Sequence, residues 1–271
     1  MKHWTLDDIA WDRFDRSKVD PELVGLIKAA ALVERNGGDY ARYLHGVFAG
    51  DTAFQGEAER WAAEEIQHGE ALGRWARLAD PSWDFEAAQQ RFTAGYRVNI
   101  NATESIRGSR TGELIARCIV EVGTSSYYTA LADRAAEPVL KQICLKIAAD
   151  EFRHYKLFYD NMKRYQTAEN LGFWGRLRIG IGRITESEDD ELAYAFFAAN
   201  DLPGPYDRRR SINAYIRRAY ACYQPAHIDR GLGMVMKAVG LKPRGRLHAA
   251  LTRLAVGIMQ RRVRRLAASG A

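Results

Sequence analysis

The sequence has few cysteines and no long apolar run. Its three cysteines, Cys118, Cys144 and Cys222, are an odd number and have no zinc-type spacing, which argues against a disulfide framework and a zinc site. We expect them to be reduced core residues of a cytoplasmic protein. No stretch of 18 apolar residues occurs, so no membrane-spanning helix is expected. The first eight residues carry acids where a signal peptide needs an apolar segment, so none is expected.

Glycine and proline are also too sparse to indicate disorder. Hydrophobic residues make up 47% of the 271 positions, enough for a large buried core. The formal charge is +6, and the segment from Arg244 to Arg265 is rich in arginine without a single acid. Such a segment suits an acidic protein, anionic lipid or nucleic acid. A solvated helix face is the alternative, and we expect no nucleic-acid function.

A period of 3.6 residues dominates the apolar pattern, which predicts an all-α protein. Four long helices with a short connecting helix are typical of a bundle, and they are expected at 21–48, 52–78, 85–98, 111–135 and 138–165. Asp20 is placed to cap the first helix, with Pro21 at its first position.

The remainder changes character from about Leu171. Four glycines between residues 172 and 182 suggest a looser link. Shorter helices are expected at 187–200, 208–222, 226–239 and 246–268. The sequence therefore predicts a bundle with an N-terminal arm over residues 1–166 and a helical extension over 167–271.

Two segments share the pattern acid-Glu-x-x-His, namely Glu64 to His68 and Asp150 to His154. Residues three apart share a helix face, so Glu65 with His68, and Glu151 with His154, form two-pronged ligand sets. Each pair continues an apolar stripe, and a buried glutamate needs a strong partner such as a metal ion. One such match is expected by chance from the composition, whereas two on long helices are more specific.

Two further glutamates complete the pattern. Glu34 lies 31 residues before Glu65, and Glu121 lies 30 residues before Glu151. This spacing brings each single glutamate level with the Glu-x-x-His of the next helix. The arrangement is that of di-iron carboxylate bundles, with six predicted metal ligands: Glu34, Glu65, His68, Glu121, Glu151 and His154. The alternative is a coincidence of surface glutamates.

The ligand types suit two iron ions. Carboxylates can bridge hard cations and change binding mode with oxidation state, and each imidazole supplies one nitrogen. Four carboxylates also balance the charge of two Fe²⁺ ions. Manganese remains possible from ligand type alone. Because a ligating histidine usually donates its other N–H to a carboxylate, we expect Asp150 to reach His68, and Glu64 either to serve His154 or to be an exposed helix acid.

The two motifs resemble those of the soluble acyl-acyl carrier protein desaturases of the ferritin-like superfamily. That family has Ala-Glu-Glu-Asn-Arg-His-Gly and Ala-Ala-Asp-Glu-Lys-Arg-His, where this chain has Ala-Glu-Glu-Ile-Gln-His-Gly (63–69) and Ala-Ala-Asp-Glu-Phe-Arg-His (148–154). The resemblance spans roughly residues 1–166 and is tight only around these motifs. It implies a homodimer that uses two irons (Fe²⁺/Fe³⁺), dioxygen and a ferredoxin-like electron donor.

The resemblance also suggests further site residues. Thr124, one turn after Glu121, matches a threonine implicated in handling protons at the oxygen site. Trp4 in Lys2-His3-Trp4 matches a tryptophan on an electron route to a ligating histidine. Ordinary packing of the N-terminal arm is the alternative for Trp4. With Asp150, these are the candidate catalytic residues.

Three functions are compatible with such a site. The first is an oxygen-dependent desaturase of a fatty-acyl chain on acyl carrier protein, with a deep apolar slot beside the metals. The second is another di-iron oxygenase or hydroxylase, and the third is a ferritin-like protein that handles iron or peroxide. The extra 100 C-terminal residues argue against the third.

The last predicted helix has an apolar stripe of Leu247, Leu251, Leu254, Ile258 and Leu266 beside several arginines. The stripe either packs on the protein's own bundle or lies on an anionic membrane surface.

Overall fold

The computed structural model describes residues 3–186 and 190–268, which form helices joined by short loops and contain no β-strand. Three 3₁₀ turns (Leu6–Asp8, Trp11–Arg13, Arg16–Lys18) belong to the N-terminal arm. Six helices follow: α1 (Pro21–Arg35), α2 (Gly37–Val47), α3 (Thr52–Ala79), α4 (Phe85–Gly95), α5 (Arg110–Arg134) and α6 (Pro138–Glu169). The predicted all-α, ferritin-like bundle is confirmed.

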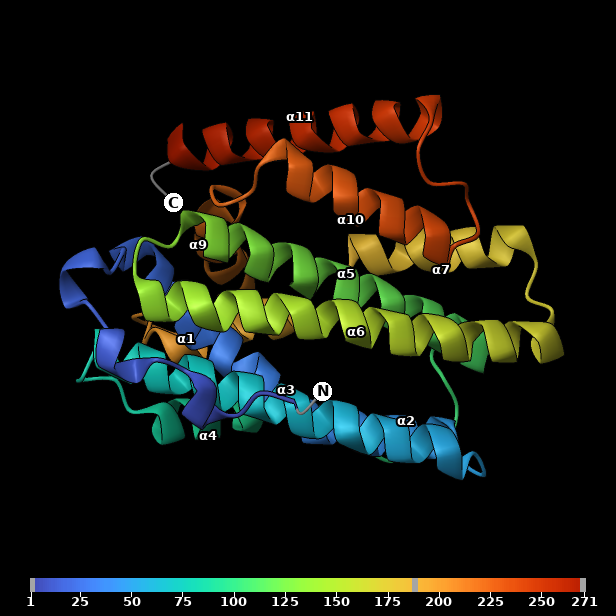
Figure 1. Ribbon diagram of the computed structural model, residues 1–271, viewed down its shortest axis with the longest axis horizontal. Helices are drawn as coiled ribbons and strands as arrows, with labels where there is room; N and C mark the ends of the chain where they lie inside the picture. Colours follow the sequence, from blue (N-terminus) through green and yellow to red (C-terminus); the bar gives the residue numbers. More distant parts are fainter. Residues whose placement is uncertain (1–2, 187–189, 269–271) are drawn as a thin grey trace.

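The bundle consists of two helix pairs. Helices α5 and α6 lie side by side along their length, while α1 and α2 together follow α3 in the opposite layer (Figure 1). Short polar caps set where these helices begin. Asp20 accepts from Glu22 N as predicted, Asp51 accepts from Phe54 N, and Ser109 accepts from Gly112 N. These caps fix the first residues of α1, α3 and α5.

The prediction of one helix over 21–48 is wrong, because the chain breaks at Asn36 between α1 and α2. The break lies beside Gly37, where an added Cβ would lie only 2.7 Å from the Cβ of Glu65. The missing side chain lets α2 approach α3 closely at the level of the predicted metal ligands.

Two buried apolar clusters fill the bundle, one toward each end. Along α3, the first includes Leu72 and Trp75, and the second includes Phe54 and Trp61. Glu65 and His68 fall between these clusters, and so do Glu151 and His154 on α6. The fold therefore places one polar layer inside an otherwise apolar interior, where charges need strong partners.

The C-terminal helices are α7 (Phe173–Thr185), α8 (Asp190–Ala199), α9 (Arg208–Tyr220), α10 (Pro225–Ala238) and α11 (Arg246–Ala268). Helices α7 and α10 pack on α5, and α8 packs on α1 and α4 (Figure 1). The predicted start of the helix at 187–200 lies outside the described residues. The predicted boundary at residue 166 falls inside α6, which continues to Glu169.

The expected looser link after Leu171 is wrong, because α7 runs through three of its four glycines. At Gly180 an added Cβ would lie 2.5 Å from a methyl carbon of Val239. Glycine here permits close helix packing and does not mark a flexible segment.

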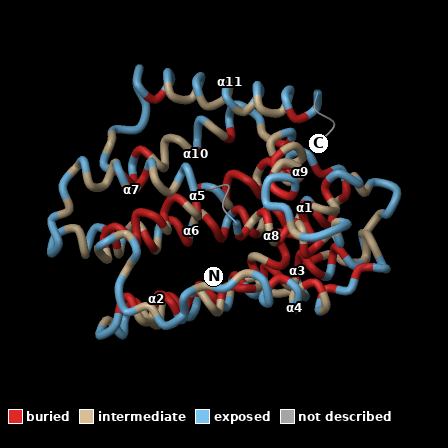
Figure 2. Tube along the Cα trace, turned by 180° about the vertical axis from the view of Figure 1, so that it is seen from behind, coloured by how far each residue is buried: buried red, intermediate tan, exposed pale blue. Residues whose placement is uncertain are grey.

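Helix α11 covers α9 and α10, and much of its outer side is exposed (Figure 2). Of the predicted apolar stripe, Leu266 is buried, while Leu247, Leu254 and Ile258 are exposed. Among the described residues, no helix is long and apolar enough to cross a membrane. The three cysteines are free and buried, as predicted.

Candidate metal centre

The six predicted ligands meet in the polar layer of the bundle. Glu34 comes from α1, Glu65 and His68 from α3, Glu121 from α5, and Glu151 and His154 from α6. All six are between 0 and 7% exposed. A surface coincidence of glutamates would leave them in water, so that alternative is excluded.

The imidazole Nδ1 atoms face the carboxylates. His68 Nδ1 lies 3.5 Å from both Glu34 and Glu65 and 3.3 Å from Glu151. His154 Nδ1 lies 3.0 Å from Glu65, 3.7 Å from Glu121 and 3.9 Å from Glu151. Metal ligands about 2.0–2.2 Å from an ion lie about 3 Å or more from one another. The spacing of these donor atoms therefore fits ions placed between them.

Two donor sets, each within 4.8 Å, can be drawn from these residues. One contains Glu34, Glu65, His68 and Glu151, and the other contains Glu65, Glu121, Glu151 and His154. Glu65 and Glu151 belong to both sets. Since each carboxylate has two oxygens, these two residues can bridge a pair of ions.

Unpaired buried atoms give an independent test of fit. The Nδ1 atoms of His68 and His154 and one oxygen each of Glu121 and Glu151 have no hydrogen-bond partner among the described residues. Leaving such atoms unpaired in the interior is costly. All four belong to the donor sets, so a pair of cations would satisfy them together.

The electrostatics agree with this fit. Burial and the charge of Glu65 raise the pKa of Glu34 well above its ordinary value, and burial and the charge of Glu151 do the same for the pKa of Glu121. Burial lowers the pKa of each histidine, but the surrounding carboxylates outweigh it and raise it overall. Without metal, the layer must hold protons to reduce the repulsion among its carboxylates.

Acids hold the outer faces of both histidines; the contact with His68 was predicted, and the contact with His154 was one of the two alternatives for Glu64. His68 Nε2 lies 3.0 Å from Asp150, and His154 Nε2 lies 2.8 Å from Glu64. Glu64 is therefore not a free helix acid. These bonds fix a proton on each Nε2 and turn each Nδ1 toward the centre.

Asp150 also connects the centre to the N-terminal arm. It accepts from Trp4 Nε1 at 2.6 Å and lies 2.9 Å from His3 Nε2. Burial alone would raise its pKa, but hydrogen bonds from His68, Arg153 and Trp4 outweigh it and hold the pKa of Asp150 well below its usual range. The Trp4 ring stacks on His68 with centroids 5.9 Å apart.

Two other hydroxyl groups contact candidate ligands. Thr124 Oγ1 donates to Glu151 at 2.6 Å, so the structure places this predicted residue at the centre. Tyr128 donates to Glu34 at 2.5 Å and is fully buried. Its role had not been predicted, although its position seven residues after Glu121 puts it on the same face of α5. His3 was also missed, and its only sequence signal is its position next to Trp4.

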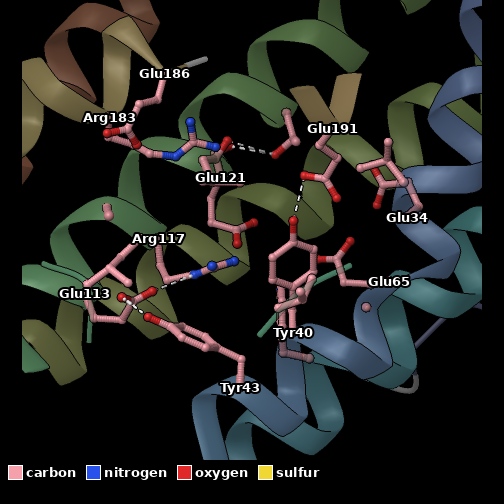
Figure 3. A pocket seen from close by; sticks show the side chains of 18 of the residues that line it. Glu34, Tyr40, Tyr43, Glu65, Glu113, Arg117, Glu121, Arg183, Glu186 and Glu191 are labelled. Atoms are coloured by element: carbon pink, nitrogen blue, oxygen red, sulfur yellow. Dashed lines mark hydrogen bonds and ion pairs between the residues drawn. The ribbon is translucent and has the colours of Figure 1, made fainter. Parts of the chain in front are cut away.

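A cavity of about 340 Å³ opens beside the centre. It touches all four candidate ligand glutamates, and its wall includes Val33, Trp61, Ala116 and Val120. Arginine, glutamate and tyrosine side chains also point into it (Figure 3). The wall of this cavity combines apolar and charged side chains, and the expected deep apolar slot stays a prediction.

This centre, inside this bundle, places the chain in the ferritin-like class with a carboxylate–histidine site. Comparison with known proteins is more specific. A family model described as fatty acid desaturase matches residues 41–170, which include five of the six candidate ligands. The chain is also 28% identical over 177 residues to palmitoyl-[acyl-carrier-protein] 4-desaturase 2, chloroplastic, of Ophrys sphegodes.

That alignment covers 61% of this chain and 46% of the relative, so the chain spans about half the length of the curated relative it matches. The two matches support an acyl-acyl carrier protein desaturase-like family for this chain.

Proposed function

We propose that this protein is a di-iron, oxygen-dependent oxidoreductase that desaturates a fatty-acyl chain. As in the substrate that the relative's name gives, acyl carrier protein would carry this chain as a thioester. The observation that carries the proposal is that two buried donor sets share Glu65 and Glu151. Two bound iron ions would supply the oxidation by dioxygen of an unactivated carbon–hydrogen bond. Glu34 and His68 would complete one iron site, and Glu121 and His154 the other.

The protein's own contribution is to orient these groups and to exclude water. Asp150 and Glu64 fix the two imidazoles, and Tyr128 restrains Glu34 by its hydrogen bond. The apolar clusters on both sides keep the layer dry, which strengthens every electrostatic interaction within it.

Thr124 is the proposed proton-handling residue. It lines the cavity, and its hydroxyl contacts Glu151. It can therefore exchange a proton between the cavity and a bridging carboxylate without a large movement.

Trp4 is the proposed entry point for electrons. It is half-buried, bonds to Asp150 and stacks on His68, so it joins the outer arm to a ligand by two contacts. Packing of the arm alone would require the stacking but not the buried hydrogen bond to the acid that orients His68.

A second candidate is another di-iron oxygenase, with a more polar substrate, and the charged cavity wall favours it. Apart from the metal ligands, the cavity is lined by four arginines and three glutamates.

The other partners are proposals as well. A ferredoxin-like donor would supply electrons, and two chains would form a homodimer. The basic outer side of α11, with its exposed Leu254 and Ile258, suits an acidic carrier or an anionic membrane surface.

The test uses iron-loaded protein, reduced without oxygen and then exposed to it with a ferredoxin system and a panel of acyl carriers. We expect an acyl product two mass units lighter by mass spectrometry, and none from Glu151→Ala. Gain of one oxygen atom would favour the second candidate. Peroxide consumption without any acyl product would refute the proposal in favour of iron or peroxide handling.

A further inference from the structure

The cavity beside the centre has a built polar site of its own, on the face of α5 one turn before Glu121. Arg117 lies there, and its side chain is only 13% exposed. Its Nε donates to Glu113 at 3.2 Å, and its guanidinium lies 4.8 Å from the centre of the Tyr40 ring. Residues four apart share a helix face, so Arg117 and Glu121 both face the cavity (Figure 3).

Glu113 holds Arg117 by one edge only. This buried carboxylate also accepts from Tyr43 at 2.8 Å and from Ser105 at 2.7 Å. A guanidinium has five N–H donors. Among residues 3–186 and 190–268, the two terminal nitrogens of Arg117 have no hydrogen-bond partner. Its hydrogen-bonding capacity is therefore mostly unused, and it is directed at the cavity.

Two acceptor groups near Arg117 already have hydrogen-bond donors. Tyr40 donates to Glu191 at 2.6 Å across the cavity, and Glu113 already receives three donors. Arg117 thus offers unused donors to the cavity, whose lining apart from the metal ligands has four arginines and three glutamates. The complement of this arrangement is a ligand with a planar anionic acceptor, for which arginine is suited.

The distance to the candidate metal ligands indicates what such a ligand would be. Arg117 and Glu121 are four residues apart, or about 6 Å along the helix axis. Ala116 and Val120 lie beside them and provide apolar wall for a short chain. A group held by Arg117 would place carbons a few bonds away opposite Glu121 and Thr124.

We propose that Arg117 binds a carboxylate carried by the substrate's chain. This deepens the proposed function, since it specifies the substrate of the same site, and it rests on that function only for the reaction. The carboxylate has two possible sources: a free carboxylic acid, or an acyl thioester whose inserted end is a carboxylate.

The test is calorimetric titration of the iron-loaded protein, without oxygen, with four probes: hexanoate, 1-hexanol, hexanoyl-pantetheine and adipoyl-pantetheine. We expect at least one carboxylate probe to bind about 10- to 100-fold more tightly than its uncharged counterpart. Preference for hexanoate identifies the free acid, and preference for adipoyl-pantetheine over hexanoyl-pantetheine identifies the thioester.

Variants assign the binding to Arg117. Arg117→Gln should remove the preference, and Arg117→Lys should restore part of it. Glu113→Gln/Arg117→Gln avoids a buried unpaired acid and keeps the test valid if the single variant unfolds. Arg134→Gln is the matched control, because Arg134 is on the same helix but pairs with Asp20.

Two results would overturn the inference: equal binding of charged and uncharged probes, or a carboxylate preference that persists in both glutamine variants. Persistence would mean that the carboxylate binds the iron directly or that Arg117 is only a hydrated partner of Glu113. The iron content of each sample is measured in parallel. If the protein retains iron and either of these two results is found, only this inference is overturned. Failure of the protein to bind iron removes the proposed function instead.

Discussion

Glu65 and Glu121 should differ in how many metal ions depend on them. Glu65 belongs to both donor sets, whereas Glu121 belongs to one. Glu65→Ala therefore leaves three residues in each set, and Glu121→Ala leaves the set around His68 complete. The structure thus predicts different iron stoichiometries for two substitutions of the same chemical kind.

The expected magnitudes follow from the donor count. Losing even a residue outside the ligands costs about 10- to 100-fold in metal affinity, and losing a ligand should cost at least as much. After dialysis against a competing chelator, we expect about two irons per wild-type chain, about one in Glu121→Ala and close to none in Glu65→Ala.

The assay is iron per folded chain by elemental analysis, with Mössbauer spectra to detect the magnetic coupling of a bridged pair. Glu121→Ala should retain uncoupled iron. The control is Glu70→Ala on the same helix, since Glu70 pairs with Arg35 and lies outside the donor sets. Equal iron loss in Glu65→Ala and Glu121→Ala, or full retention in Glu65→Ala, would refute a pair bridged by Glu65.

Three further predictions concern the surroundings of the centre. Gly37→Ala should destabilise the fold by about 1–3 kcal/mol and reduce iron loading, because the new Cβ would lie 2.7 Å from the Cβ of Glu65. The matched Gly38→Ala has its nearest contact at 3.9 Å and should be neutral or about 1 kcal/mol more stable; chemical denaturation measures both, and equal effects would contradict the packing argument. Asp150→Asn should weaken iron binding about 10- to 100-fold by releasing the orientation of His68, measured by competition with a chelator, and unchanged affinity would count against this role. Both site histidines have a folded-state pKa above the ordinary 6.5, and two site glutamates have a folded-state pKa above 4.5. The folded metal-free chain therefore binds extra protons, and the stability that the histidines contribute is complete below pH 6.5 and is lost as pH rises through their folded pKa. The melting temperature of the metal-free chain should thus fall as pH rises above about 6.5, while that of iron-loaded protein should not; a constant or rising melting temperature in the metal-free chain would refute the direction of this pH dependence.

The sequence alone was enough to predict the centre, because its signals are local. An acid-Glu-x-x-His pattern puts two side chains on one helix face whatever the tertiary context, and its repetition with glutamates 30 and 31 residues upstream sets the level of all four helices. The acid that holds His68 followed from the same pattern, since Asp150 precedes a ligand, whereas the pattern left two alternatives open for Glu64.

Only the tertiary structure determined the rest. Gly37 meets α3 directly after the break at Asn36, and Gly180 of α7 meets Val239. Neither contact has a signal in the local sequence, where glycine by itself suggests a loop. The charged cavity wall brings Arg117, Tyr40 and Glu191 together from three helices distant in sequence. Local periodicity determines which side chains share a helix face, but the packing of the helices determines what that face meets.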